Sequence, residues 1–286
     1  MGRTRRRSPL FLAVMPISCH RSLLARAVVP AYLRLRSGRP VNKTSEPILN
    51  VPPVVIGTIA VLIVIHVVRV WLLPPALERE FILIFAFIPA RYDPAIVLPG
   101  GLAGGYGAEI WSFVTYALIH ADLLHLGLNV VWLLPFGSAL ARRLGPARFT
   151  AFMLSTAAAG AGAHLAVHFG EVYPMVGASA AISGTMAAAM RFAFQRGGPV
   201  LSWHAHDDAS YRVPAVSLFG SLRDPRFLAF VAVWFGINAV FGLGGLQLDN
   251  GQSVAWEAHI GGFVAGLLLF SLFDPVSRTS YSDTPD

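Results

Sequence analysis

The sequence predicts an all-α polytopic membrane protein with six transmembrane helices. Of its 286 residues, 55% are hydrophobic and only 13% are charged, about half the charged share of a soluble globular protein. Six apolar stretches also reach the length, about 20 residues, that a helix needs to cross a bilayer. Polar residues within these stretches are the first places to look for function, because burying them in lipid is costly.

The expected membrane domain covers residues 51–273. A basic cytoplasmic extension at 1–50 precedes it, and a short polar tail at 274–286 follows. The apolar run 81–90 is too short for a span and includes Pro89, so it suits an interfacial or re-entrant segment of the first outer loop. The six spans are expected at residues 52–73, 123–140, 149–170, 172–194, 227–248 and 253–273.

The distribution of basic residues sets the orientation of the spans. With both termini in the cytoplasm, 19 of the 22 Lys and Arg residues lie on the cytoplasmic side, and only Arg69, Arg79 and Arg91 lie outside. This bias is the positive-inside signal, and it predicts an N-in, C-in topology. The net charge of +7 is therefore mainly a topology signal, with an excess in the first 43 residues that suits contact with anionic lipid.

Composition also excludes several classes of protein. The basic N-terminal run is followed by an apolar stretch and not by a nucleic-acid-binding domain, so no nucleic-acid partner is expected. Cys19 is the only cysteine, which rules out a disulfide framework within one chain and a thiolate zinc site. The Arg-rich, Lys-poor usage indicates a high-GC bacterial genome and hence a bacterial inner membrane.

Four polar residues lie near the start of the even-numbered spans. They are His125 and Asn129 in the second, Ser179 in the fourth and His259 in the sixth. Because all three spans run from outside to inside, these residues are expected at a similar shallow depth below the outer surface. His125 and Asn129 are four residues apart and share a helix face, and both can donate hydrogen bonds.

Small residues accompany Ser179 and His259. Ser179 and Ser183 belong to a small-residue strip, and Gly262 and Gly266 form a GxxxG face below His259. Such faces let membrane helices approach backbone to backbone. Close packing of these two spans would bring a serine hydroxyl within reach of an imidazole that can deprotonate it for attack on a carbonyl.

Three motifs in this order resemble the rhomboid family of intramembrane serine proteases, over roughly residues 50–273. They are HxxxN at His125 and Asn129, GxS ending at Ser179, and HxxGxxxG beginning at His259. Trp111 and His120 also fit the family pattern. The resemblance implies a six-helix rhomboid-like bundle with a Ser-His dyad and neither metal nor cofactor. Ser179 would be the nucleophile and His259 the general base, with His125, Asn129 and the Ser179 backbone amide lining an oxyanion hole.

The resemblance implies an enzyme that cleaves membrane proteins in or near their transmembrane segments, with its site opening toward the outer side. The chain departs from the family pattern in having Ala180 for a glycine, Ser183 for an aromatic residue and Ser112 for an arginine. These departures leave open a catalytically inactive relative that acts as a binding or chaperone-like factor. A small transporter is less favoured, because the spans lack ion-coupling carboxylates.

The sequence disfavours two other classes of protease, metalloproteases and aspartyl proteases. His164 and His168 have the i, i+4 spacing of metal ligands, but no HExxH motif occurs and no carboxylate within the spans completes a site. Glu257 is expected on a different helix face from His259, in a solvated or structural role. Asp122 and Asp249 lie at span edges, so no pair of buried aspartates is expected.

Overall fold

The computed structural model describes residues 50–96, 101, 103–200, 208–242 and 254–276. The chain divides into two compact units, Met1–Asn50 and Val51–Asp286, and the second unit is described below. The basic extension expected at 1–50 lies outside the described residues apart from Asn50. Most of the tail expected at 274–286 lies outside them as well.

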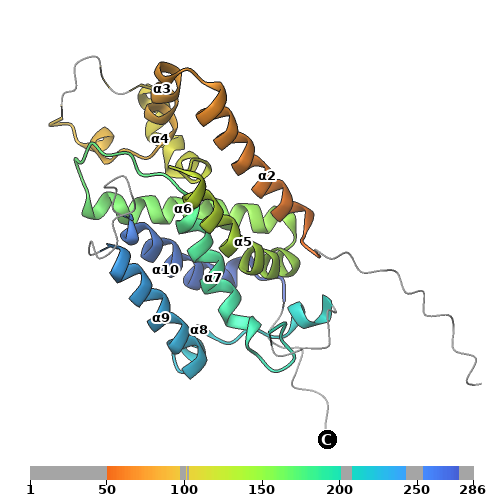
Figure 1. Ribbon diagram of the computed structural model, residues 1–286. Coiled ribbons are helices and arrows are strands. Elements are labelled where there is room, and N and C mark those ends of the chain that lie inside the picture. Colours follow the sequence, from red (N-terminus) through yellow and green to blue (C-terminus); the bar gives the residue numbers. More distant parts are fainter. Residues whose placement is uncertain (1–49, 97–100, 102, 201–207, 243–253, 277–286) are drawn as a thin grey trace, which may run out of the picture. The chain divides into compact units, whose positions relative to one another are not determined.

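Regular structure in the described ranges is helical, and an isolated bridge between Phe87 and Met175 is the β-type pairing found there. Short π or 3-10 turns occur at Val68–Leu72, Pro89–Tyr92, Tyr116–Leu118 and Asp208–Arg212. The α-helices, shown in Figure 1, are α2 (Pro53–Val67), α3 (Pro75–Phe85), α4 (Gly105–Thr115), α5 (Leu123–Leu144), α6 (Pro146–Val167), α7 (Ser179–Ala193), α8 (Leu218–Ser221), α9 (Pro225–Gly242) and α10 (Trp256–Phe273).

Four of these helical segments are long and apolar enough to cross a membrane. They are α2 with its π-helical extension to Leu72, and α5, α6 and α10. They match the spans expected at 52–73, 123–140, 149–170 and 253–273 to within a few residues. The apolar part of α9, Pro225–Val240, is shorter and overlaps most of the span expected at 227–248, whose last residues lie outside the described part. The six-span count and the topology stay predictions.

The helix expected at 172–194 is shorter than its apolar sequence suggests. It begins at Ser179, because the chain from 169 to 178 follows an irregular path. Gly170 and Gly177 in this segment have positive φ angles of 82° and 123°, and Pro174 lacks the N–H that a helix interior needs. The turn residues, rather than hydropathy, decide where the helix starts.

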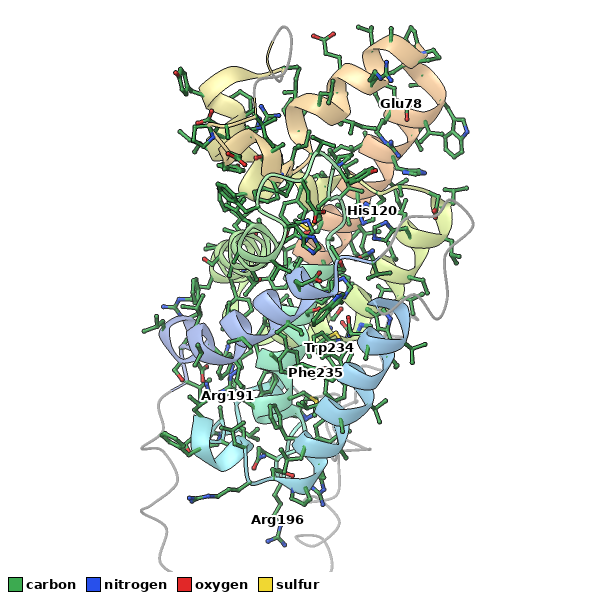
Figure 2. The ribbon with its side chains drawn as sticks, turned by 90° about the vertical axis from the view of Figure 1, so that its left-hand side faces the viewer. Glu78, His120, Arg191, Arg196, Trp234 and Phe235 are labelled. Atoms are coloured by element: carbon green, nitrogen blue, oxygen red, sulfur yellow. The ribbon has the colours of Figure 1, made fainter. Side chains whose placement is uncertain are left out.

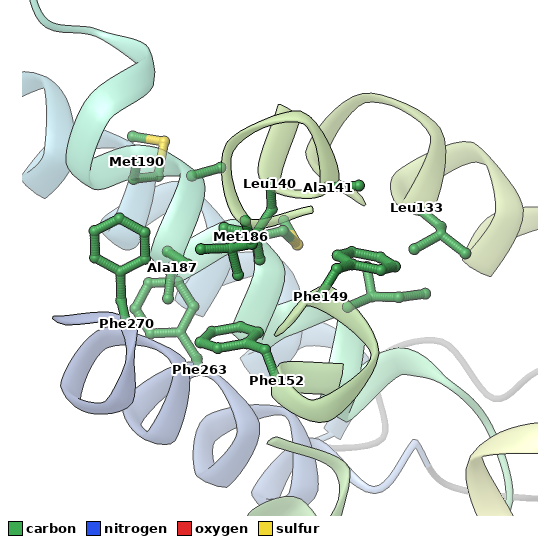
Figure 3. Close-up of a cluster of buried hydrophobic side chains, with 14 of the residues drawn as sticks. Leu133, Leu140, Ala141, Phe149, Phe152, Met186, Ala187, Met190, Phe263 and Phe270 are labelled. Atoms are coloured by element: carbon green, nitrogen blue, oxygen red, sulfur yellow. The ribbon is translucent and has the colours of Figure 1, made fainter. Parts of the chain in front are cut away.

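The helix α7 lies at the centre of the bundle, packed against α5, α6 and α10. Every residue from Ala180 to Ala193 is buried, which explains why this helix is rich in alanine and glycine. Figure 3 shows the larger apolar side chains that fill the space around it. They are Leu133 and Leu140 of α5, Phe149 and Phe152 of α6, Met186 and Met190 of α7, and Phe263 and Phe270 of α10.

The helices α5, α7 and α10 run in the same direction. At the ends of α5 and α10, Arg143 forms a two-point ion pair with Asp274, with N–O distances of 2.8 and 2.9 Å. The starts of α7 and α10 meet at the opposite end of these helices, where Ser179 contacts His259. This shared direction agrees with that expected for the even-numbered spans. In Figure 2, Glu78 and Arg196 lie toward opposite ends of the bundle, with His120 between them.

The apolar run 81–90 does not form a span, as expected. Its first half belongs to α3, and residues 86–88 are almost completely buried beside the loop that leads into α7. Ala90 N–H donates to the Glu171 carbonyl at 2.8 Å. This segment between α2 and α4 therefore supports the entry to the central helix.

Candidate active site

Ser179 is the first residue of α7 and is positioned by the preceding loop. The φ of +123° at Gly177 is a conformation that L side chains rarely adopt, so the turn into α7 favours glycine. Phe87 and Met175 exchange main-chain hydrogen bonds of 3.1 and 2.8 Å, and Gly177 N–H donates to the Tyr116 carbonyl at 3.0 Å. The loop thus fixes the place where Ser179 enters the helix.

His259 meets Ser179 across the contact between α10 and α7. Its Nε2 lies 2.7 Å from the Ser179 Oγ, and its Nδ1 lies 2.6 Å from Oδ1 of Asn238 on α9. Nδ2 of Asn238 donates to the Trp234 carbonyl at 2.8 Å, which leaves Oδ1 as the atom facing the ring. Nδ1 therefore carries the proton, and the Nε2 lone pair accepts a hydrogen bond from the Ser179 hydroxyl.

Asn238 is not among the residues that the motifs predict. It is 6% exposed and lies within the fifth expected span. The signal that could have found it is the one used for the other spans, a polar side chain inside an apolar helix. It gives His259 a fixed partner on the side of the ring away from Ser179.

Two glycines of α10 allow this contact. A Cβ added to Gly262 would overlap the Ala180 main chain, and one added to Gly266 would overlap the Gly184 main chain. The obstructing atoms belong to the backbone of α7, so they cannot move aside as a flexible side chain would. The close packing that the GxxxG face predicts is confirmed, and it sets the distance between Ser179 and His259.

His125 faces the same small space as Ser179. The position that a Cβ of Gly177 would occupy is 2.7 Å from the His125 Nε2 and 3.6 Å from the Ser179 Oγ. Asp122 caps α5 by accepting from the His125 N–H at 2.7 Å, which fixes the first turn of that helix. The absence of a side chain at Gly177 therefore leaves room beside both polar groups.

Asn129 lies one turn beyond His125 and is 4% exposed. Its Nδ2 donates to the His125 carbonyl at 2.8 Å, and its Oδ1 has no hydrogen-bond partner among the described residues. The structure thus brings Ser179 and His259 into direct contact and places His125 beside the same space. Asn129 is held against the backbone of α5, without a hydrogen bond to Ser179.

His120 packs against His125 and thereby helps to hold its ring in place. It is completely buried, and its ring centroid lies 5.2 Å from that of His125. Burial and the neighbouring His125 lower the pKa of His120 to about 3, so its ring is neutral at pH 7. The buried Arg69 guanidinium donates to the carbonyls of His120 and Ala121, and thereby ties the end of the first span to the loop before α5.

The structure shows which groups contact the three residues that depart from the family pattern. The methyl group of Ala180 lies against Gly160 of α6, where an added Cβ would be only 2.5 Å from it. Ser183 Oγ donates to the Ser179 carbonyl at 2.7 Å. Ser112 is buried, with its Oγ 3.1 Å from the Tyr92 hydroxyl. None of the three interrupts the contact between Ser179 and His259.

Comparison with known proteins agrees with the motifs. The Rhomboid domain model matches residues 107–274, more than half of the chain. A Rhomboid protease GlpG of Enterobacter sp. (strain 638) is 26% identical over 192 residues, covering 66% of this chain and 58% of that protein. A Rhomboid protease GlpG of Pectobacterium atrosepticum is 25% identical over 182 residues, covering 62% and 53%. The matches thus span little more than half the length of these relatives. By its domain match, this chain belongs to the rhomboid family.

Proposed function

We propose that this chain is a serine endopeptidase that cleaves peptide bonds in or near the transmembrane segments of other membrane proteins. The observation that carries the proposal is the 2.7 Å contact between Ser179 Oγ and His259 Nε2, with the opposite ring nitrogen bound to Asn238. A nucleophile in contact with a base that is itself oriented by a third group is the arrangement that serine hydrolysis needs. Membership of the rhomboid family supports the same assignment.

The reaction would proceed by acyl transfer. Ser179 Oγ attacks the carbonyl carbon of the scissile peptide bond while His259 Nε2 accepts the hydroxyl proton. His259 then donates this proton to the leaving amine, and a water molecule hydrolyses the acyl-enzyme by the same route. Asn238 Oδ1 accepts from Nδ1–H throughout, so it keeps the ring oriented while the imidazolium forms.

The oxyanion of the tetrahedral intermediate would lie in the space beside Gly177. His125 Nε2 borders this space, and the N–H groups of the first turn of α7, including that of Ser179, have no intrahelical acceptor. The helix N-terminus adds a partial positive charge. A single donor in such a site contributes about 10²- to 10³-fold to the rate, and Asn129 would act by holding the first turns of α5.

The proposed setting is a bilayer crossed by six spans with both termini in the cytoplasm. The polar groups lie at the starts of α5, α7 and α10, which in this topology is the outer end of each helix. Water and an unwound substrate segment would then enter from the outer side. The substrates would be other membrane proteins, and the membrane a bacterial inner membrane.

Labelling with a fluorophosphonate probe tests the proposed nucleophile directly. The purified chain in detergent is expected to form a covalent adduct at Ser179, located by mass spectrometry of its peptides. Labelling should disappear in Ser179→Ala and fall strongly in His259→Ala, because the hydroxyl is activated by the imidazole. A folded chain that shows no labelling at Ser179 would contradict the proposed mechanism and indicate a non-catalytic relative.

Asn238→Leu is expected to slow cleavage by roughly 5- to 30-fold, since a lost hydrogen bond of about 1–2 kcal/mol translates into that factor. The fall should appear in kcat with little change in KM, and the pH–rate profile should shift. Asn238→Asp keeps an acceptor oxygen facing the ring and should restore most of the rate. If Asn238→Leu and Asn238→Asp lost the same amount of cleavage activity and the pH–rate profile were unchanged, Asn238 would contribute only to helix packing.

A further inference from the structure

A second cluster of polar side chains lies where the end of α6 meets the start of α10. It comprises His164 and His168 from one side and Glu257 from the other, and their ligand atoms all lie within 4.8 Å of one another. The structure therefore places a carboxylate beside the two histidines, where the sequence predicted none within the spans. The carboxylate comes from a residue 89 positions away from His168 in the chain, and only the packing of α10 against α6 brings it there.

Both ring nitrogens of His168 face carboxylates. Nδ1 lies 3.0 Å from a Glu171 oxygen, and Nε2 lies 3.2 Å from a Glu257 oxygen. Two donors that bind one zinc ion at 2.0–2.2 Å in tetrahedral geometry lie about 3.4 Å apart. The Nε2–Glu257 spacing therefore already fits a shared ion, while the Glu171 contact is of the kind that orients a metal-bound histidine from its other nitrogen.

His164 supplies an unsatisfied imidazole to the same cluster. It is 9% exposed, and its Nδ1 is buried without a hydrogen-bond partner in the described part of the chain. Its ring stacks on that of His168, with centroids 4.3 Å apart. A buried polar nitrogen without a partner destabilises the folded chain. An ion bound by this nitrogen would satisfy it after a rotation of the His164 ring about χ2, with His168 left in place.

We propose that His164, His168 and Glu257 bind one divalent transition-metal ion, with Zn²⁺ the best match, while Glu171 orients His168. Two imidazoles and one carboxylate are a donor set that suits zinc, and they leave the fourth tetrahedral position for water. Magnesium and calcium prefer all-oxygen sites. The side chain of His168 is 25% exposed and that of Glu171 is 53% exposed, so the site is open to solvent.

The ion would join two elements that carry the candidate active site. His168 caps the end of α6, and Glu257 lies in the first turn of α10, two residues before His259. A bound ion would hold this turn against α6 and thereby oppose fraying of α10 beside the dyad. The site is separate from Ser179 and His259, so metal binding does not depend on proteolytic activity.

Titration of the purified, tag-free full chain with Co²⁺ tests the proposal. Co²⁺ bound to a tetrahedral site absorbs strongly in the visible range, and Zn²⁺ is expected to displace it at one equivalent per chain. Glu257→Gln, His168→Ala and His164→Ala should each weaken binding by about 100-fold or more, and Glu171→Gln by about 10- to 100-fold. Glu80→Gln, the same change at an exposed glutamate outside the cluster, should have no effect.

Two further measurements separate this site from the dyad and from misfolding. His259→Ala should keep the Co²⁺ spectrum, because its imidazole is not a ligand. Zn²⁺ should raise the Tm of the unmodified chain and not that of Glu257→Gln. A Co²⁺ spectrum that survives all three ligand substitutions, that is lost in His259→Ala, or that never forms would overturn the proposal.

Discussion

Ser179→Ala is expected to reduce cleavage of a single-span model substrate by about 10⁴-fold or more, and His259→Ala by a similar factor. The physical reason is that Oγ forms the bond to the substrate and Nε2 takes its proton, so neither role has a substitute. The two groups lie 2.7 Å apart and act as a unit. The double variant should therefore be hardly slower than either single one.

The measurement is the initial rate of substrate cleavage by each purified variant in detergent. Ser155→Ala is a matched control, because its hydroxyl donates to the Ala151 carbonyl within α6 and lies outside the candidate site. Its rate should stay within a few-fold of that of the unmodified chain. Undiminished cleavage by both Ser179→Ala and His259→Ala, with their folding verified by Tm, would exclude the proposed mechanism.

Gly262→Val should have the second largest effect, with a loss of about 10²-fold or more in cleavage and a lower Tm. The new Cβ would overlap the Ala180 carbonyl group, so α10 must move away from α7. A displacement of about 1 Å at a reacting group can cost roughly 10²-fold in rate. Forcing extra volume into a packed core also destabilises a protein by about 1–3 kcal/mol.

Gly57→Ala provides the control for this substitution. Gly57 lies in the interior of α2, and a Cβ there would meet no atom within 4 Å. Alanine should therefore be neutral or should raise the free energy of unfolding by up to about 1 kcal/mol, because it favours the helix. Cleavage and Tm are measured for both variants. If Gly262→Val kept full activity and stability, the backbone contact between α7 and α10 would not determine the distance between Ser179 and His259.

The apolar stretches located most of the long helices, because about 20 apolar residues in a row have few alternatives to a membrane helix. Hydropathy failed at the start of α7. The apolar residues of 172–178 belong to an irregular loop that is exposed at its start and mostly buried from Met175 onward, and backbone geometry at Gly177 ends that loop. The short apolar run at 81–90 was correctly excluded as a span, but its pairing with Met175 depends on a contact between distant parts of the chain.

The local motifs also located Ser179 and His259, the proposed nucleophile and base, because the small-residue faces that accompany these two residues predict close helix packing. They did not reveal Asn238, which lies 21 residues before His259 and reaches it from another helix. The same limitation applies to Glu257. Its distance along the chain from His164 and His168 concealed the cluster that the three form.

By itself, the sequence determined the class of protein, the places of most of its long helices and the residues that we propose for the chemistry. These follow from local composition and from spacing along single helices, where 3.6 residues per turn dictates which side chains share a face. Only the tertiary structure decided which side chains meet across helices. Asn238 with His259, and Glu257 with His168, are contacts between segments far apart in sequence, and the crossing of α10 with its neighbours creates them.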